Sequence, residues 1–125
     1  MLTAPDPPRV TQGHIDAFAA IAGHPDSELI VATLGGEVIA TLQLTFIPGL
    51  SSGGAWRAQV EGVRVRADVR GGGIGGQLMN WVIARARRRK CWLIQLSTNR
   101  TRVDAHRFYE RLGFRASHAG MKLYL

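Results

Sequence analysis

Hydrophobic residues at the start of the chain follow two different periods. Ile15, Phe18, Ala19 and Ala22 recur at helical spacing, so residues 11–22 are predicted to form a short amphipathic helix. The chain after this segment changes to the alternating, β-branched pattern that is typical of strands.

Two apolar runs rich in β-branched side chains occupy residues 28–34 and 37–47, and Gly35 and Gly36 join them. Two such runs with a two-glycine connection are typical of a β-hairpin, so these segments are predicted to pair. Serine and glycine dominate residues 48–54, which predicts a loop.

A third strand is predicted over residues 56–66. Strict alternation along it would place Gln59, Glu61, Val63 and Val65 on one face.

Glycine supplies five of the six residues in 71–76, and a long amphipathic helix begins within this cluster. Its predicted apolar stripe comprises Ile74, Leu78, Trp81, Val82 and Ala86. The remaining pattern predicts a strand over 91–98, a helix over 103–112 that ends at Gly113, and a final strand over 121–125. Antiparallel strands followed by alternating strands and helices indicate an α+β or mixed α/β fold.

The 125 residues suit one domain spanning the whole chain, with the proline-rich residues 1–10 as a flexible arm. A content of 46% hydrophobic and 20% charged residues excludes disordered and collagen-like proteins. The apolar runs are too short to cross a bilayer and the start lacks a signal-peptide pattern, which predicts a soluble cytoplasmic protein. Cys91 is the single cysteine, which excludes an internal disulfide framework, and it is expected to be a small core residue.

Lysine and arginine outnumber aspartate and glutamate by 16 to 9, for a net charge of +7. Such an excess favours a polyanionic partner, whether nucleic acid, a membrane surface or a phosphorylated cofactor, although a merely solvated basic surface gives the same count. Because no nucleic-acid-binding motif and no aromatic interleaving accompany the charge, no nucleic-acid partner is predicted. No membrane partner is predicted either.

The glycine cluster suits a phosphate group. N–H groups at a helix N-terminus are unpaired and positively polarised, glycine lets the backbone approach a ligand, and Arg70 adds a charged donor. Gly71, Gly73 and Gly76 match the dinucleotide-binding spacing, but the motif neither follows a strand directly nor precedes an acidic residue by about 20 positions. No Lys-Ser/Thr pair follows the loop, which excludes a nucleotide P-loop. A flexible turn without a ligand is the alternative.

Two motifs together resemble the GNAT acyltransferase superfamily. Arg70-x-x-Gly73-x-Gly75 is similar to the family's R/Q-x-x-G-x-G/A signature, and residues 104–114, DAHRFYERLGF, resemble the end of its last helix. One helix and one strand separate the two blocks, as in the family, and the resemblance covers residues 28–125. It implies a mostly antiparallel sheet that is splayed where acetyl-CoA binds and flanked by helices, with the N-terminal strand and helix shortened or missing.

The resemblance implies acetyl-CoA as co-substrate. Backbone groups of Val63 and Val65 are implied to hold the pantetheine arm, and Asn99 is a further candidate contact. The residues implied to hold the pyrophosphate are Arg70, Gly71, Gly72, Gly73, Gly75 and Gly76. The basic run 85–90 is expected to be a solvated helix face, with the adenosine 3′-phosphate as its alternative partner.

Acetyl transfer from a thioester to an amine needs a base for the amine, a polarised carbonyl and an acid for the thiolate. By the resemblance Tyr109 is the expected acid, the alternative being a half-buried ring bonded to the backbone. Glu61 is the expected base, directly or through water, because it is predicted to share a strand face with Val63; its alternative is a pair with a nearby arginine. His106 and His118 are weaker candidates. No pair of His, Asp or Glu has metal-ligand spacing, so no metal is predicted.

These features predict an N-acetyltransferase that moves acetyl from acetyl-CoA directly to a primary amine, a small molecule rather than a protein. The alternative is a non-catalytic CoA-binding regulatory module. Arg102 stands where the family often has asparagine. The missing first strand leaves an uncovered sheet edge, which predicts a homodimer.

Overall fold

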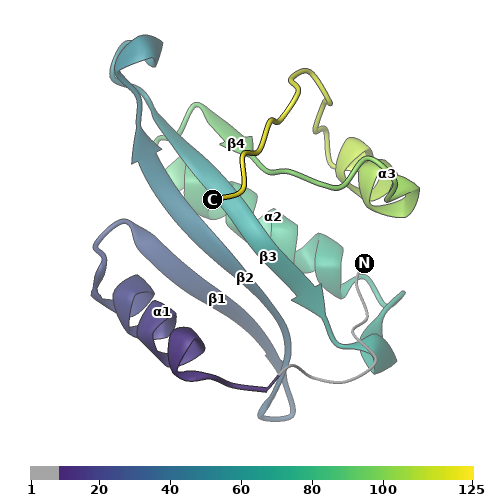
Figure 1. The fold of residues 1–125 in the computed structure, drawn as a ribbon. Coiled ribbons are helices and arrows are strands. Elements are labelled where there is room, and N and C mark those ends of the chain that lie inside the picture. Colours follow the sequence, from purple (N-terminus) through teal and green to yellow (C-terminus); the bar gives the residue numbers. More distant parts are fainter. Residues whose placement is uncertain (1–8) are drawn as a thin grey trace. The chain divides into compact units, whose positions relative to one another are not determined.

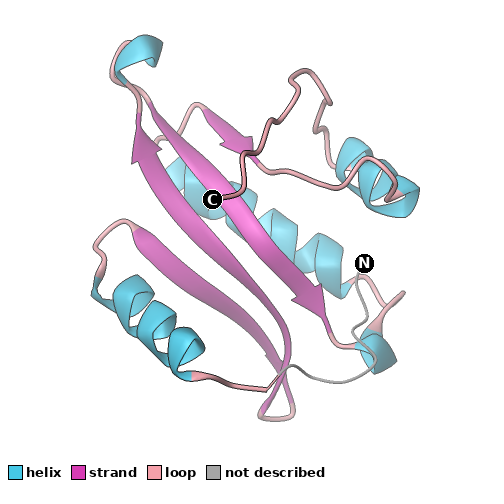
Figure 2. Ribbon diagram, viewed as in Figure 1, coloured by secondary structure: helices cyan, strands magenta, loops and turns pink. Residues whose placement is uncertain are grey.

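A four-stranded mixed sheet organises the compact unit that the structure describes over residues 9–96 (Figures 1 and 2). The strands, in spatial order, are β1 (Ser27–Leu34), β2 (Glu37–Pro48), β3 (Trp56–Val65) and β4 (Leu93–Gln95). The first three run antiparallel, and β4 runs parallel to β3. The predicted hairpin and mostly antiparallel sheet are confirmed, whereas β4 is shorter than the predicted strand over 91–98.

The computed structural model describes residues 9–125, which fall into two compact units, residues 9–96 and Ser97–Leu125. Most of the predicted arm, residues 1–10, lies outside the described residues. The assignment of residues 1–125 to one domain stays a prediction.

Two helices flank the sheet of the first unit. In Figure 1, α1 (Gln12–Gly23) lies beside β1, while α2 (Ile74–Arg88) passes behind the sheet and contacts β2, β3 and β4. Thr11 caps α1 by a reciprocal pair of hydrogen bonds with His14, which fixes the start of this exposed helix. In the described part of the chain no helix is both long and apolar enough to span a bilayer.

Apolar side chains of β2, β3 and α2 form the core. Leu42 and Leu44 of β2 are fully buried, as are Met79 and Val82 of α2. The buried face of α2 comprises Gly75, Leu78, Met79, Val82 and Ala86. Trp81, predicted to belong to this stripe, is 43% exposed, because Met79 fills the core position next to Leu78 and leaves the indole at the margin of the helix face.

The unit Ser97–Leu125 contains one helix, α3 (Val103–Arg111). The chain leaves it at Gly113, whose φ of 101° is in the left-handed region that glycine tolerates. The predicted strand over 121–125 is wrong: these residues form no strand and their apolar side chains are exposed. Their alternation is that of a strand, but the described residues of this unit offer no other strand with which the backbone can pair.

Candidate functional site

A single glycine interrupts the regular pairing of β3. Thr41 of β2 lies opposite Arg64 and Gln43 lies opposite Glu61, so the one residue of β2 between these pairs faces two residues of β3. Gly62 adopts a φ of 64°, in the left-handed region that favours glycine. The strand therefore carries a β-bulge at Gly62.

The bulge exchanges the faces to which the last residues of β3 point. Ala58 and Val60 are buried before it, Val65 is buried after it, and Val63 is half-buried. The prediction that Glu61 shares a face with Val63 and Val65 is therefore wrong, because strict alternation fails where one extra residue is inserted.

Glu61 instead shares its face of the sheet with Arg64, and both side chains are exposed. We call this surface the open face. On β2, β3 and β4 it comprises, by cross-strand register, Thr41, Gln43, Thr45, Ile47, Arg57, Gln59, Glu61, Arg64, Leu93 and Gln95. Within residues 9–125 no ion pair joins Glu61 to an arginine. Of the arginines in and just after β3, Arg66 does form ion pairs, but its partners are Glu37 and Asp68. Glu61 is thus an accessible carboxylate among mostly neutral side chains.

The sheet is splayed on the side of β3 that faces β4. Parallel pairing ends at Gln59 and Gln95, where Nε2 of Gln95 donates to Oε1 of Gln59 at 2.9 Å. Within the described sheet, residues 60–65 have no partner strand on that side. This part of β3 is therefore an open edge, as the resemblance implied.

Backbone groups of Val63 and Val65 face the open edge. The N–H of Arg66 donates to the carbonyl of Ile39 on β2 at 2.8 Å. Since successive residues of a strand turn their backbone groups to opposite sides, Val65 and Val63 turn theirs away from β2. The carbonyl of Val65 accepts a hydrogen bond of 3.0 Å from Nε of Arg70, which ties the open edge to the start of the glycine loop.

The glycine loop leads into the N-terminus of α2. Gly71 and Gly73 have φ values of 81° and 83°, and Gly73 is the N-cap residue. No described side chain caps this helix and its first turn holds no acidic residue. The first N–H groups of α2, those of Ile74, Gly75 and Gly76, therefore present their partial positive charge at the loop. This set of donors fits an anion such as a phosphate.

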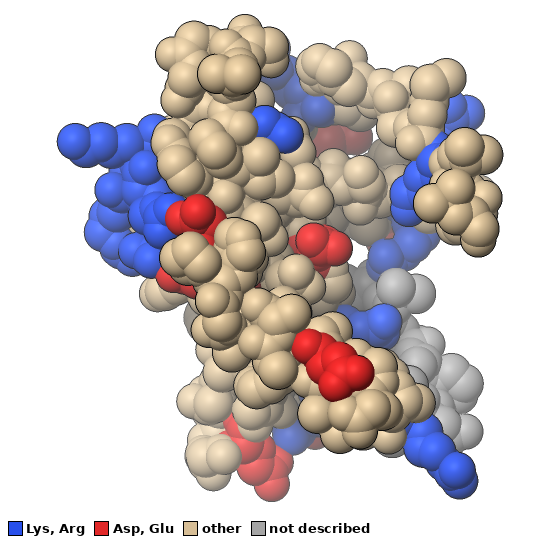
Figure 3. Space-filling model, turned by 60° about the vertical axis from the view of Figure 1, so that its left-hand side comes forward, with Lys and Arg blue, Asp and Glu red and all other residues tan. Residues whose placement is uncertain are grey.

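The basic residues at the other end of α2 support the fold. Arg85 donates from two nitrogen atoms to Glu28 of β1, one bond being 3.1 Å, and Arg89 bonds Asp26 at 2.9 Å while lying 4.1 Å from the ring centroid of Phe46. Figure 3 shows acidic side chains set among basic ones along one side of the molecule. Because the 15 residues of α2 separate this end from the glycine loop by about 20 Å, a contact with a 3′-phosphate held near the loop is disfavoured.

Tyr109 lies on α3, in the unit Ser97–Leu125. Its ring makes edge contacts with Phe108 and Phe114, with centroids 5.0 and 5.6 Å apart. Burial raises the pKa of the phenol above its usual range, and the charge of Arg102 opposes this in part. The hydroxyl therefore keeps its proton at neutral pH, as a proton donor must.

Asn99 and His106 organise the loop before α3. Oδ1 of Asn99 accepts hydrogen bonds from N and Oγ1 of Thr101 at 3.0 and 2.8 Å, and Nε2 of His106 lies 3.0 Å from the carbonyl oxygen of Asn99. Nδ1 of His118 lies 2.7 Å from Oγ of Ser117. Both histidines thus make local contacts, and the amide nitrogen of Asn99 is the atom suited to a further partner.

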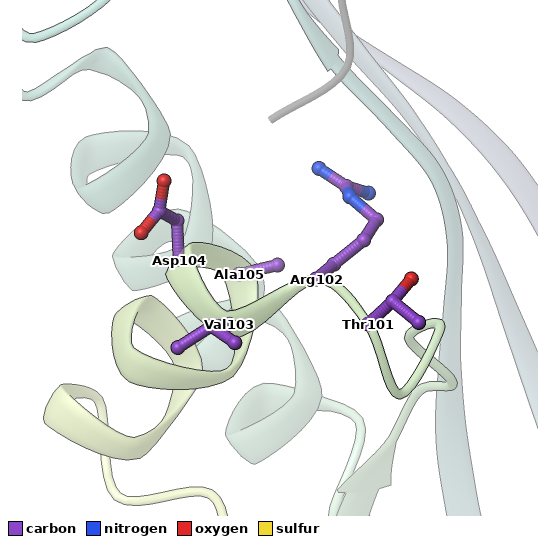
Figure 4. Close-up of a pocket in the computed structure, with 5 residues that line it drawn as sticks. All are labelled: Thr101, Arg102, Val103, Asp104 and Ala105. Atoms are coloured by element: carbon purple, nitrogen blue, oxygen red, sulfur yellow. The ribbon is translucent and has the colours of Figure 1, made fainter.

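An open pocket of about 290 Å³ lies at the N-terminus of α3, and Thr101 to Ala105 line it (Figure 4). Figure 4 shows Arg102 and Asp104 extending from the backbone in different directions. The sequence did not predict this pocket. Arg102, the residue at which the chain departs from the family motif, is one of the residues that line this pocket.

Cys91 is partly rather than fully buried, and burial raises the pKa of its thiol. A raised thiol pKa disfavours the thiolate, so this side chain is not activated as a nucleophile. Among the described residues, no group of three His, Cys, Asp or Glu side chains is placed to hold a metal ion.

The model of the acetyltransferase (GNAT) family matches residues 1–114 of the chain. The chain belongs to this family. It is 36% identical over 107 residues to the aminoalkylphosphonate N-acetyltransferase of Salmonella typhimurium. The matched segment covers 86% of this chain and 69% of that protein. This GNAT acetyltransferase is therefore an acyl-transferring enzyme, and its family implies acetyl-CoA as co-substrate.

Two solved structures show the same fold. A transcriptional regulator from Bacillus halodurans is 49% identical, with a TM-score of 0.89 over 93% of this chain and 77% of that one. Glucosamine-6-phosphate N-acetyltransferase from Arabidopsis thaliana is 21% identical, with a TM-score of 0.80 over 93% of this chain and 80% of that one, which shows a shared fold alone. The predicted family and fold class are confirmed.

Sequence reasoning missed that Glu61 and Arg64 lie on the same face of the sheet in this GNAT acetyltransferase. The signal was a lone glycine, Gly62, inside a strand pattern, which indicates a bulge. A bulge moves every later side chain of its strand to the other face, so this one residue changes which groups stand beside the candidate base.

Proposed function

We propose that this GNAT acetyltransferase moves an acetyl group from acetyl-CoA directly to a small primary amine, with Glu61 as general base and Tyr109 as general acid. The geometry of β3 carries the proposal. Its open edge is tied to the glycine loop by the bond from Arg70 to Val65, while its open face presents Glu61. A place for the acyl donor and a base for the acceptor thus lie on one strand.

The proposed acetyl-CoA site consists of the glycine loop and the open edge of β3. The backbone of Val63 and Val65 is proposed for the pantetheine arm, with Nδ2 of Asn99 as a further contact. The residues proposed for the pyrophosphate are Arg70, Gly71, Gly72, Gly73, Gly75 and Gly76. The uncapped N-terminus of α2 and the absence of acidic side chains in its first turn support this placement.

When bound, acetyl-CoA supplies a thioester whose carbonyl carbon accepts the amine and whose sulfur leaves. Glu61 takes the proton that the amine must lose, directly or through a water molecule. Tyr109 gives its phenolic proton to the departing sulfur. The pKa of this phenol, raised by burial, lies above neutral pH, so the phenol carries the proton that it is proposed to give. Holding the amine and the thioester together supplies much of the remaining rate enhancement.

A small amine is the proposed acceptor because the Salmonella typhimurium relative is named for a small amine, an aminoalkylphosphonate. The first experiment is calorimetric titration with acetyl-CoA, with NADH as control, followed by mass spectrometry of reactions with a panel of small amines. We expect acetyl-CoA to bind at about micromolar concentration, NADH to give no heat, and at least one amine to be acetylated. Failure to bind acetyl-CoA contradicts the proposal, and binding without any product favours a non-catalytic CoA-binding module.

A cytoplasmic location and a homodimer are further parts of the proposal. The outer edge of β1 has no partner strand within the described sheet, and Ile15 and Phe18 of the neighbouring helix α1 are 52% and 59% exposed. Open edges and exposed apolar side chains favour association with a second copy. Light scattering at micromolar concentration is expected to give the mass of a dimer, and a monomer mass contradicts this part.

A further inference from the structure

The bulge places a cation next to the proposed base. Arg64 and Glu61 lie opposite Thr41 and Gln43, which are two residues apart on β2 and therefore neighbours on the open face. A two-residue step along a strand is about 7 Å. Across this separation, the Arg64 side chain is long enough for its guanidinium and the Glu61 carboxylate to contact the same small ligand.

Arg64 is exposed and is a member of no ion pair within residues 9–125. The arginine two residues later differs, because Arg66 bonds Glu37 at 2.8 Å and Asp68 at 2.6 Å. The charge of Arg64 is thus available to a ligand on the open face.

The neighbours of Arg64 on the open face provide no second carboxylate. Apart from Glu61 and Arg57, its neighbours on β2, β3 and β4 are uncharged: amides, threonines, Ile47 and Leu93. Arg57 lies on the same face but four residues from Glu61, about 13 Å along the strand, and its Nη1 is beside Gly49 of the loop that precedes β3. Among the cations that the strand register places on the open face, Arg64 is therefore nearer to Glu61 than Arg57 is.

We propose that Arg64 binds an anionic group of the acceptor and so delivers its amine to Glu61, which makes the preferred substrate a primary amine with an oxyanion, best a phosphonate or phosphate, a short alkyl chain away. This inference rests on the proposed function and names its substrate class. A guanidinium recognises such oxyanions through paired, charge-assisted hydrogen bonds. The neighbouring carboxylate attracts the ammonium end, so the two residues also fix the direction in which the acceptor lies.

The test compares three acceptors of similar length: 2-aminoethylphosphonate, β-alanine and uncharged propylamine. The wild-type enzyme is expected to show the highest kcat/KM with the phosphonate. Arg64→Gln is expected to lower that value by about tenfold to a hundredfold, mainly through KM, and to leave propylamine nearly unchanged. Arg64→Lys is expected to retain part of the preference. The control is Arg87→Gln, an exposed arginine in the last turn of α2, which is expected to behave as wild type.

A wild-type enzyme with no preference for an anionic acceptor overturns the inference, and so does an Arg64→Gln variant that loses all three activities equally. A preference for β-alanine over the phosphonate keeps the anion site but overturns the assignment to phosphonate or phosphate. An NMR titration that measures the binding of methylphosphonate separates this inference from the proposed function, because binding needs no turnover. If no amine is acetylated but methylphosphonate binds the wild type at least tenfold more tightly than Arg64→Gln, the anion site stands and the proposed function fails. Equal binding by both proteins overturns the anion site.

Discussion

Gly62 shows how one residue decides the composition of the candidate site. Its left-handed φ of 64° allows the extra residue of the bulge, and the bulge brings Arg64 rather than Val63 onto the face of Glu61. Without it, the strand would continue to alternate and Glu61 would stand beside valine side chains. The residue that organises this face therefore has no side chain of its own.

Gly62→Ala is predicted to destabilise the protein by about 1–2 kcal/mol, because an L-residue pays that cost in the left-handed region. A Cβ at this position would meet no atom within 4 Å, so the expected cost comes from backbone conformation and not from a clash. The free energy of unfolding in urea measures it. Gly23→Ala is the control, since its Cβ would also meet nothing and its φ is not left-handed. Equal stability of the two variants would contradict this account of the bulge.

At the scale of elements, periodicity predicted the hairpin, the three helices and the mostly antiparallel sheet, because these depend on local patterns. It failed where long-range geometry decides. The side chains that each face of β3 presents depend on a bulge, and residues 121–125 lack a partner strand in their unit. On α2, Met79 is buried in the core and Trp81, which was predicted to be buried, is partly exposed. A strand exists only with a partner, and a sequence does not state which partners are available.

The ion pair between β1 and α2 gives a prediction about pH. Glu28 and Arg85 are 28% and 27% exposed, and the hydrogen bond from Arg85 is the largest cause that lowers the pKa of Glu28 from 4.5. A lowered pKa means that the folded state holds the proton less tightly than the unfolded state. The stabilisation is therefore full above pH 4.5 and is lost as the pH falls through the lowered pKa.

Glu28→Gln is accordingly predicted to cost about 0.5–1 kcal/mol of unfolding free energy at pH 7, the small value reflecting a partly exposed pair. The difference from wild type should shrink as the pH is lowered below 4.5. Glu37→Gln is the control, because its pair with Arg66 is largely exposed and is expected to contribute nothing measurable. A pH-independent difference for Glu28→Gln would show that packing, and not charge, accounts for the loss.

At the scale of the whole molecule, the net charge of +7 is divided between structure and function. Arg85 and Arg89 are used to join α2 to the sheet and its flank, whereas Arg64 and the glycine loop face solvent where anions can arrive. A basic surface raises the encounter rate with an anionic co-substrate such as acetyl-CoA. The net charge alone could not distinguish these uses, because the use of each arginine depends on whether the fold places a carboxylate beside it.

The candidate site was predictable in part. The glycine loop and Arg70 follow from residue type and spacing, and the backbone role of Val63 and Val65 follows from the family motif and agrees with the open edge of β3. The proposed role of Arg64 could not be predicted from the sequence, because the placement of Arg64 beside Glu61 depends on the register between β2 and β3. Tyr109 belongs to the other unit, and its assignment still rests on the motif together with its raised pKa.

The most direct test of the central claim is the turnover number of Glu61→Gln with a saturating small amine and acetyl-CoA. The substitution keeps the shape of the side chain and removes its ability to accept a proton. We predict that kcat falls at least about a hundredfold, while the acetyl-CoA dissociation constant stays within about twofold of wild type, because the proposed base lies on the open face and the proposed co-substrate site on the open edge. A kcat within about fivefold of wild type would contradict the assignment of Glu61 as the general base.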